Sequence, residues 1–447
     1  MKEKHKSPLK NAPLCEAGIV EGFFGPPWTH EGRMSLIRNM PRMGFSTYIY
    51  APKDDLFHRI QWNLHYPPAE FARLVSLIRL CRERGVDFVW AVSPGLTIRH
   101  AKDGDFDLLA EKFERIAGEG VRSFALFLDD IPRELIFKED RARFASLADA
   151  HVFIANRLYR RLIKSRPDAR LLFCPTDYYT IKPTPYLETI GRGLDPAIPV
   201  FWTGPKVVPP AITAADARAI TNILRRKPLL WDNYPVNDYN RRKLNLGPLR
   251  GRDPKLPRLL SGYFANPMNE PAASMIPLMT AAEYLRDPAG YDPDAAWRRA
   301  VRAFAENAGA GRETEAALAD FCAAWPAGFF AGEPPCPMET AAADARFGNS
   351  APLKRILERI PELTALLAAA PGLRDFVAET QPFADGLLKY TDAAKLAFDL
   401  RSRPGDKKLR MKLVDSFFAA NRTTIQPAKQ SLRKFILETI ELTKDVT

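Results

Sequence analysis

Residues 122–131 read RSFALFLDDI, an apolar run that ends in two adjacent aspartates. A second run of this kind, LLFCP, occupies 171–175. Strands that are apolar almost throughout are typical of a parallel sheet covered on both faces. The pattern therefore predicts an α/β protein whose helices pack against both sides of the sheet.

Outward from this segment, one unit repeats between residue 16 and about residue 267: a short apolar run, a polar or Gly/Pro break, and a stretch with helical periodicity. The predicted strands are 17–24, 46–50, 88–93, 123–128, 170–175, 199–203, 228–231 and 260–265. The predicted helices between them are 31–43, 69–84, 106–118, 141–164 and 214–226. Eight such strands predict a (β/α)8 TIM barrel, closed by a helix at 272–285. A doubly wound sheet is the competing fold, but no GxGxxG follows the first strand.

The pattern changes after Asp287-Pro288, where the strands stop and Ala-, Leu- and Lys-rich helical periodicity takes over. The helices expected there are 294–308, 313–325, 353–369, 373–384, 387–401, 407–421 and 428–444. We therefore predict three parts: a basic N-terminal tail at 1–15, the catalytic barrel at 16–288, and an α-helical bundle domain at 289–447.

Composition excludes several classes of protein. The five cysteines are scattered and never spaced as CxxC, which argues against a disulfide framework or a zinc ribbon and favours a reducing compartment. No apolar stretch is long enough to span a membrane, and no apolar run follows the basic N-terminus, so neither a membrane segment nor a secretory signal is expected. The expected location is the cytoplasm.

The net charge of +12 raises the question of nucleic-acid binding. Most of this charge lies at the chain ends: four lysines against one glutamate in 1–10, and eleven Lys/Arg against five acids in 401–447. Solvated surface is the simpler explanation, and an acidic partner is the alternative. We expect no nucleic acid and no membrane as partner, and the sequence does not indicate an oligomeric state.

In such a barrel, function belongs at the carboxyl ends of the strands. The residues found there are carboxylates, amides and aromatic groups, which suit a sugar with many hydroxyls and an apolar face. A nucleotide site would need a phosphate loop, and no GxxxxGK[ST] occurs. The six histidines are dispersed and form no HExxH, so neither a metal nor another cofactor is expected.

The strongest candidates are Asp129 and Asp130. Neighbouring side chains of a strand point to opposite faces, so both carboxylates reach one pocket only if the strand ends there and the chain turns. Two carboxylates held close together cannot both ionise freely, and the one that keeps its proton becomes a general acid. The alternative is a helix N-cap followed by a first-turn acid, or a solvated pair.

Each remaining candidate also has a plain structural explanation. A lysine next to two aspartates, as at Lys53, is typical of a surface ion-pair cluster. Trp202 and Trp231 are typical of core packing. For Tyr178 the plain explanation is a hydrogen bond to a loop, and the Asn and Asp residues after the strands favour turns and caps. Their position at the same end of different strands is what favours a shared site.

At these positions the chain resembles glycoside hydrolase family 84, the β-N-acetylglucosaminidases that include the protein O-GlcNAcases. The matching segments are GIVEGFFGPPW (18–28), STYIYAPKDDLFHR (46–59), AVSPGL (91–96), RSFALFLDDI (122–131), FCPTDYY (173–179), FWTGPKVV (201–208), WDNYPVNDYNRRKLNLGP (231–248) and ANP (265–267). They stand in the family's order across residues 16–285.

The resemblance implies substrate-assisted hydrolysis with retention, in which the 2-acetamido oxygen attacks the anomeric carbon and gives an oxazoline intermediate. It implies that Asp129 orients the acetamido N–H and that Asp130 is the acid and then the base. The roles implied for the other residues are these: Tyr178 bonds the acetamido oxygen, Gly22, Lys53, Asp238 and Asn266 bind the sugar hydroxyls, Asn233 lies near the acid pair, and Thr203 and Trp231 wall the acetamide pocket.

The resemblance thus implies an enzyme that removes terminal β-linked GlcNAc, with GlcNAc-modified proteins or glycans as its substrates. Ser/Thr-linked GlcNAc of proteins is the first expectation. Oligosaccharides or glycan termini are the alternative substrates, and a non-catalytic GlcNAc-binding protein is the alternative function.

Overall fold

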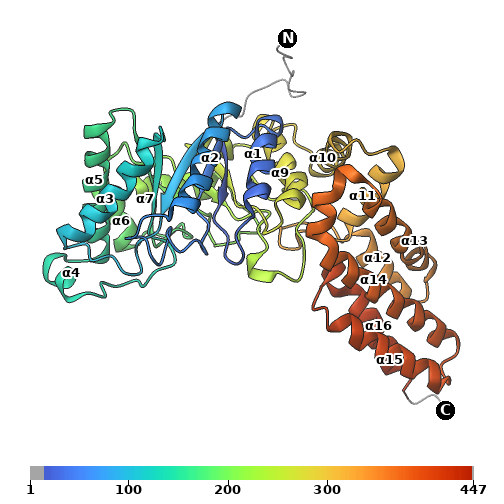
Figure 1. Cartoon of the computed structure of the whole chain (residues 1–447). Helices are drawn as coiled ribbons and strands as arrows, with labels where there is room; N and C mark the ends of the chain where they lie inside the picture. Colours follow the sequence, from blue (N-terminus) through green and yellow to red (C-terminus); the bar gives the residue numbers. More distant parts are fainter. Residues whose placement is uncertain (1–14, 445–447) are drawn as a thin grey trace, which may run out of the picture. The chain divides into compact units, whose positions relative to one another are not determined.

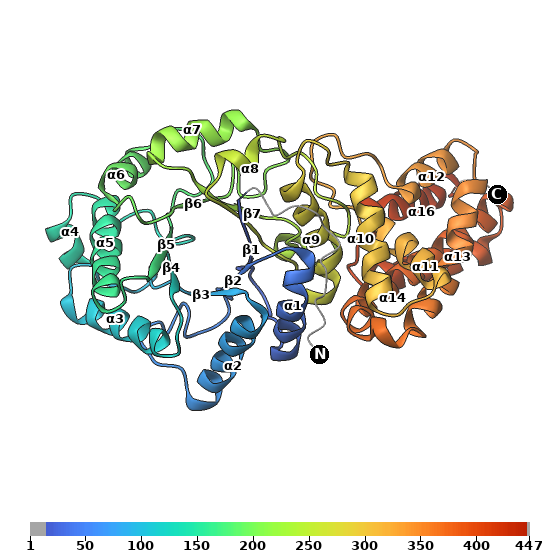
Figure 2. The same ribbon diagram turned by 90° about the horizontal axis from the view of Figure 1, so that it is seen from above.

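A computed structural model describes residues 15–444 of the chain. Eight parallel strands lie side by side and confirm the predicted barrel (Figure 2). They are β1 (Glu16–Glu21), β2 (Thr47–Tyr50), β3 (Asp87–Val92), β4 (Ser123–Phe127), β5 (Arg170–Cys174), β6 (Phe201–Trp202), β7 (Leu229–Asp232) and β8 (Gly262–Ala265). The predicted strands differ from these bounds by one to three residues at one or both ends.

The strand order is β5-β4-β3-β2-β1-β8-β7-β6, and a parallel bridge between Phe173 and Val200 joins the two outermost strands. In the register of β1, Ile19 pairs with Tyr48 on one side and with Ala265 on the other. The barrel interior is filled by buried side chains from the strands, among them Val20, Ile49, Val89, Phe127, Leu172, Phe201 and Phe264. This interior is a packed core, so a site belongs at its mouth.

Helices surround the strands (Figures 1 and 2). They are α1 (His30–Met43), α2 (Pro68–Arg84), α3 (Asp103–Gly118), α4 (Lys138–Arg143), α5 (Leu147–Ser165), α6 (Pro185–Gly193), α7 (Ala214–Leu224) and α8 (Leu256–Leu259). The single helix predicted at 141–164 is wrong: the chain breaks between α4 and α5, where the Ser146 side chain accepts a hydrogen bond from the backbone of Asp149 and caps α5.

The rest of the chain is helical. Its helices are α10 (Pro293–Asn307), α11 (Arg312–Ala323), α12 (Pro337–Arg346), α13 (Ala351–Ala368), α14 (Arg374–Ser402), α15 (Lys407–Asn421) and α16 (Ser431–Leu442). The helix α9 (Pro271–Arg286) precedes them. The predicted break between 384 and 387 is wrong, because α14 runs straight through Gly386. A Cβ there would lie 2.7 Å from Ile425, so this glycine permits close packing and does not end a helix.

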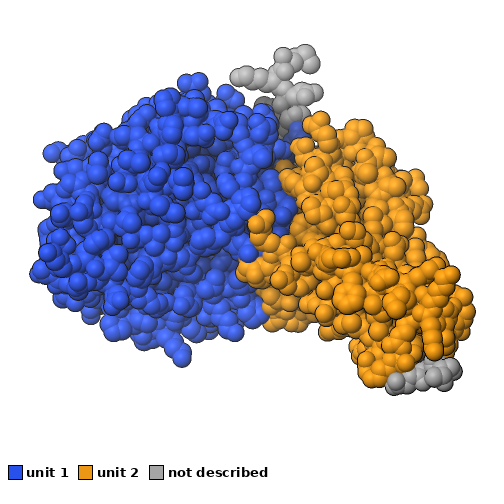
Figure 3. Space-filling view, turned by 60° about the horizontal axis from the view of Figure 1, so that its bottom comes forward, with its two compact units in different colours: residues 1–238, 250–271, 281–291 blue, residues 239–249, 272–280, 292–447 orange. Residues whose placement is uncertain are grey.

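The chain forms two compact units, coloured separately in Figure 3. One comprises residues up to 238 with 250–271 and 281–291, and the other comprises 239–249, 272–280 and the residues from 292. The predicted closing helix at 272–285 forms as α9, with 272–280 in the second unit. Apart from Cys15, the predicted tail at 1–15 lies outside the described residues, and the predicted boundary at 288/289 stays a prediction. None of the described helices is long and apolar enough to cross a membrane.

Candidate active site

The turn after β4 places both aspartates at the barrel mouth. The strand ends at Phe127, and Asp130 has a φ of +49°, in the left-handed region. This conformation costs an L-residue roughly 1–2 kcal/mol, although aspartate tolerates it better than most residues. Asp129 is buried and Asp130 is exposed. The change of backbone direction removes the strand alternation that would separate the two side chains.

Tyr178, which follows β5, faces both carboxylates. Its hydroxyl donates a hydrogen bond to Asp130 Oδ1 at 2.7 Å. Burial raises the pKa of the Tyr178 phenol, and the negative charges of Asp130 and Asp129 raise it further. One hydroxyl therefore lies in the field of both acids. The Tyr178 ring also packs against the barrel core, which fixes its direction.

Asp129 forms a buried ion pair with Lys53, whose Nζ donates to Asp129 Oδ2. Burial alone would raise the pKa of Asp129, but the Lys53 charge and hydrogen bond outweigh it and hold that pKa below its ordinary value of 3.8. Asp129 is therefore ionised at neutral pH. The sequence did not reveal this cause.

The two oxygens of this carboxylate differ in their hydrogen-bond partners. Asp129 Oδ1 is buried and accepts no hydrogen bond from any other residue in the described part of the chain. A buried charged oxygen without a donor is costly and uncommon in native proteins. A ligand N–H placed here would satisfy it.

Aromatic rings surround the ammonium of Lys53. Its Nζ lies 5.8 Å from the ring centroid of Phe24, 5.9 Å from that of Phe127 and 5.8 Å from that of Trp231. These contacts stabilise the cation in its buried position. The structure thus places Lys53 against Asp129, and the interpretation of Lys53 as part of a surface ion-pair cluster is wrong, because its side chain is only 1% exposed.

A chain of amides joins the ends of β1, β7 and β8. The Gly22 backbone N–H donates to Asn266 Oδ1 at 3.4 Å, and Asn266 Nδ2 donates to Asn233 Oδ1 at 2.9 Å. Trp231 Nε1 donates to the same Asn233 oxygen at 3.0 Å, and Asn233 Nδ2 donates to the Val207 carbonyl at 2.7 Å. Four predicted site residues are therefore held together in one buried network.

The remaining two predicted residues shape loops at the mouth. Asp238 accepts a hydrogen bond from the Phe24 backbone at 2.8 Å. Thr203 donates from its hydroxyl to the carbonyls of Tyr178 and Lys206, at 3.3 and 3.1 Å. Thr203 therefore orients the segment that carries Tyr178, while Asp238 holds the loop after β1.

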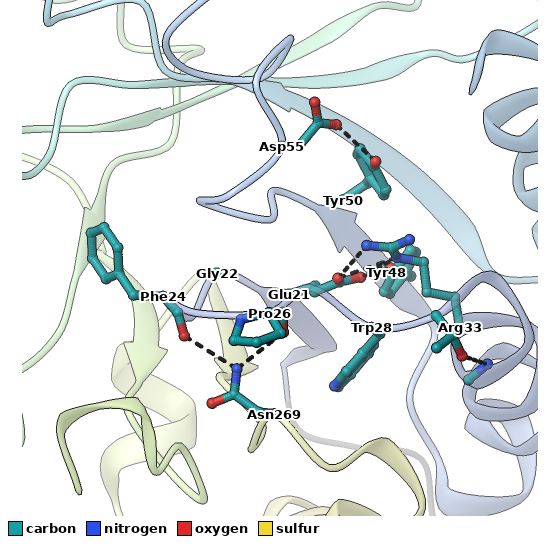
Figure 4. A network of polar contacts seen from close by, with 12 residues as sticks. Glu21, Gly22, Phe24, Pro26, Trp28, Arg33, Tyr48, Tyr50, Asp55 and Asn269 are labelled. Atoms are coloured by element: carbon teal, nitrogen blue, oxygen red, sulfur yellow. Dashed lines mark hydrogen bonds and ion pairs between the residues drawn. The ribbon is translucent and has the colours of Figure 1, made fainter. Parts of the chain in front are cut away.

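The sequence reasoning missed two residues that organise the mouth. Asn269 donates from Nδ2 to the carbonyls of Phe24 and Pro26, both at 3.2 Å (Figure 4). Arg59 donates from Nη2 to the Asp130 carbonyl at 2.8 Å. Arg59 lies within the KDDLFHR segment, but nothing in the sequence indicates which partner it reaches. Figure 4 also shows the buried Glu21 turned toward Arg33 and Tyr48, where it forms part of the scaffold.

The barrel mouth is tightly packed around Gly22. A Cβ at this position would lie 2.2 Å from the Trp231 indole. We expect Gly22→Ala to displace this ring and to lower the free energy of unfolding by ~1–3 kcal/mol. Denaturant unfolding measures the change. The control is Gly104→Ala in α3, where a Cβ meets nothing within 4 Å; equal stability of the two variants would contradict the packing described.

Among the described residues, no group of three or more His, Cys, Asp or Glu side chains could hold a metal ion. The chemistry available at this mouth is that of an ionised carboxylate, a second carboxyl group, a phenol and amide groups. It suits proton transfer and stabilisation of a developing positive charge on a polar ligand.

Comparisons with known proteins identify the family of the chain. The family model described as beta-N-acetylglucosaminidase matches residues 17–323. The Protein O-GlcNAcases of Rattus norvegicus and Mus musculus are each 39% identical over 279 residues, which is 61% of this chain and 30% of each relative. The chain thus spans less than a third of the length of these curated relatives.

Two solved structures are similar over nearly the whole chain. A mutant of the Thermobaculum terrenum O-GlcNAc hydrolase has a TM-score of 0.84 at 28% identity, and the match covers 97% of both chains. CpGH84B has a TM-score of 0.77 at 26% identity, and the match covers 96% of this chain and 77% of that one.

Proposed function

The chain belongs to the beta-N-acetylglucosaminidase family, and we propose that it is a retaining hydrolase of terminal β-linked GlcNAc. The observation that carries this proposal is Asp129: a buried carboxylate, held ionised by Lys53, with one oxygen that accepts no hydrogen bond from another described residue. An acetamido N–H is a donor that fits this oxygen. Asp130 is the next residue in the chain, and its carboxyl group accepts a hydrogen bond from the Tyr178 hydroxyl.

In the first step, the acetamido oxygen of the sugar forms a bond to the anomeric carbon while the bond to the leaving oxygen breaks. Asp130 gives its proton to that leaving oxygen. Asp129 accepts the acetamido hydrogen bond and stabilises the positive charge of the oxazolinium. Tyr178 positions the acetamido oxygen by transferring its hydrogen bond from Asp130 to the substrate.

In the second step, Asp130 takes a proton from water, and the water oxygen bonds to the anomeric carbon. The oxazoline ring opens, and the acetamido group is restored. The two displacements together retain the β configuration. This course differs from hydrolysis through an enzyme nucleophile, because the substrate supplies the attacking atom.

We propose Ser/Thr-linked GlcNAc on proteins as the physiological substrate, supported by the names of the rat and mouse relatives and of the Thermobaculum terrenum structure. Gly22, Asp238 and Asn266 are proposed to bind the sugar hydroxyls, Asn233 to lie beside the acetamido group, and Thr203 and Trp231 to wall its pocket. The scattered cysteines support the cytoplasm as the location.

The proposal is tested with an aryl β-GlcNAc and the matching aryl β-glucoside, which lacks the acetamido group. We expect hydrolysis of the first, no detectable hydrolysis of the second, and release of the β-anomer in a proton NMR time course. Equal turnover of both sugars would contradict the substrate-assisted route. Binding of GlcNAc without hydrolysis would identify a binding protein, and preference for a chitin disaccharide over a GlcNAc-serine peptide would overturn the protein substrate.

A further inference from the structure

The backbone of Asp130 has an unusual requirement. Its φ of +49° is one that L-residues rarely adopt, and the β4 ladder ends before it, so β pairing does not hold it in place. The last ladder-like bond is from the Leu128 N–H to the Cys174 carbonyl at 2.9 Å. A contact outside the sheet has to fix the direction in which the Asp130 side chain leaves the backbone.

Arg59 supplies this contact from the loop between β2 and α2. Its Nη2 donates to the Asp130 carbonyl at 2.8 Å, and its guanidinium lies 5.5 Å from the ring centroid of Phe24. Arg59 is only 8% exposed, and its buried Nη1 has no hydrogen-bond partner in the described part of the chain. Burying a guanidinium so incompletely paired is unfavourable, which indicates that its position serves the site.

Hydrogen bonds to α3 and to the end of β3 hold the loop that carries Arg59. The buried Lys112 of α3 donates from Nζ to the carbonyls of Phe57, Trp62 and Leu64, at 2.6, 2.9 and 2.6 Å. His58, the neighbour of Arg59, bonds the Ala91 carbonyl through Nδ1 at 2.9 Å. Its carbonyl also accepts from the Ser93 N–H at 2.8 Å. The backbone of Arg59 is therefore held in place, and its side-chain hydrogen bond holds the Asp130 carbonyl in turn.

We propose that Arg59 is a positioning residue for Asp130: by holding its carbonyl, it aims the carboxyl group at the leaving-group oxygen. This inference rests on the proposed function, in which Asp130 is the acid. Arg59 acts through the backbone of Asp130 and transfers no proton itself. In the first step, its effect through Asp130 should therefore appear only where proton donation limits the rate; its charge also helps to lower the pKa of Asp129, and Arg59→Lys keeps that charge.

The test compares two aryl β-GlcNAc substrates, one with an acidic dinitrophenol leaving group and one with phenol. Arg59→Met removes the donor and the charge, and Arg59→Lys keeps the charge but not the planar fork. For both variants we expect kcat/KM, which reports the first step, to fall about 10- to 100-fold on the phenyl substrate and less than about threefold on the dinitrophenyl substrate. Arg59→Lys gives the result if Arg59→Met does not fold.

Two further variants make the outcome specific. Combining Arg59→Met with Asp130→Asn should cost nothing beyond Asp130→Asn alone, since the aimed acid is already absent. Arg226→Met is the matched control, because Arg226 also donates to backbone carbonyls, those of Asp195 and Ile198 at 2.7 and 2.8 Å. It should change stability without distinguishing the two leaving groups.

The inference is overturned if the Arg59 variants lose equal activity on both substrates, which would indicate general structural damage or a charge effect on Asp129. Additive losses in the double variant would also overturn it. If Asp130→Asn itself fails to distinguish the leaving groups, the proposed acid is wrong. If only the Arg59 variants fail to do so, the proposed function stands and this inference falls.

Discussion

Asp130→Asn is expected to lose activity in proportion to how poor the leaving group is. An asparagine cannot donate a proton to a departing oxygen, and general acid catalysis contributes typically ~10²–10⁴-fold. We therefore expect kcat/KM on a phenyl or serine-linked substrate to fall by about that factor. On a dinitrophenyl substrate, whose leaving group departs without a proton, kcat/KM should fall less than about tenfold, whereas kcat falls further because water attack on the intermediate also needs Asp130.

The measurement is a series of aryl β-GlcNAc substrates with leaving groups of graded acidity, in which log kcat/KM is plotted against leaving-group pKa. Asp177→Asn is the matched control, because Asp177 also follows a barrel strand, β5, but pairs with Arg133 at 2.6 Å. It should leave the slope unchanged. A uniform loss across the series for Asp130→Asn would remove Asp130 from the role of acid.

Lys53→Met is expected to convert Asp129 from a permanently ionised group into one that titrates near neutrality. Without the ammonium, burial raises the pKa of the carboxyl, by up to 3–5 units for fully buried groups. With the dinitrophenyl substrate, which does not need the acid, we expect activity at pH 6 to fall ~10²–10³-fold. Activity should then rise about tenfold per pH unit as Asp129 ionises.

The Lys53–Asp129 ion pair also makes the stability of the fold depend on pH. The direction of this dependence follows from the lowered pKa of Asp129. In the wild type, the stabilisation is fully present above pH 3.8, the ordinary pKa, and is lost as pH falls through the lower folded-state value. Lys164→Met, in the exposed last turn of α5, is the control for the loss of a positive charge. A pH profile of Lys53→Met parallel to that of the wild type would mean that Lys53 does not set the ionisation of Asp129.

The fold was largely predictable because its signals are local. Apolar runs such as 124–128 and the breaks after them indicate where strands lie to within one to three residues, and all eight predicted strands form. The helix break predicted at Gly386 was wrong. A glycine is needed there because Ile425, some 40 residues away in sequence, packs where a Cβ would lie. The missed break before α5 had a local signal, the Ser146 cap, which the helical periodicity on either side concealed.

The candidate site was predictable as a set of residues, but not as a set of contacts. Asp129 and Asp130 follow directly from a strand that ends in two acids. The pairing of Lys53 with Asp129, and of Arg59 with the Asp130 carbonyl, joins segments about 70 residues apart. From the sequence alone, a lysine beside two aspartates is expected to be exposed. In the folded barrel, Phe127 and Trp231 pack around Lys53 and bury it. Burial, which decides the charge of Asp129, is a property of the assembled barrel.

The central claim is that Oδ1 of the ionised Asp129, which has no donor from another described residue, accepts a hydrogen bond from the acetamido N–H of the sugar. A crystal structure with a thiazoline analogue of the cyclised intermediate tests it most directly. We predict the ring nitrogen within about 2.7–3.2 Å of Asp129 Oδ1, with Asp130 beside the anomeric carbon. An analogue bound with its nitrogen on another group, and Asp129 Oδ1 still without a donor, would contradict the account.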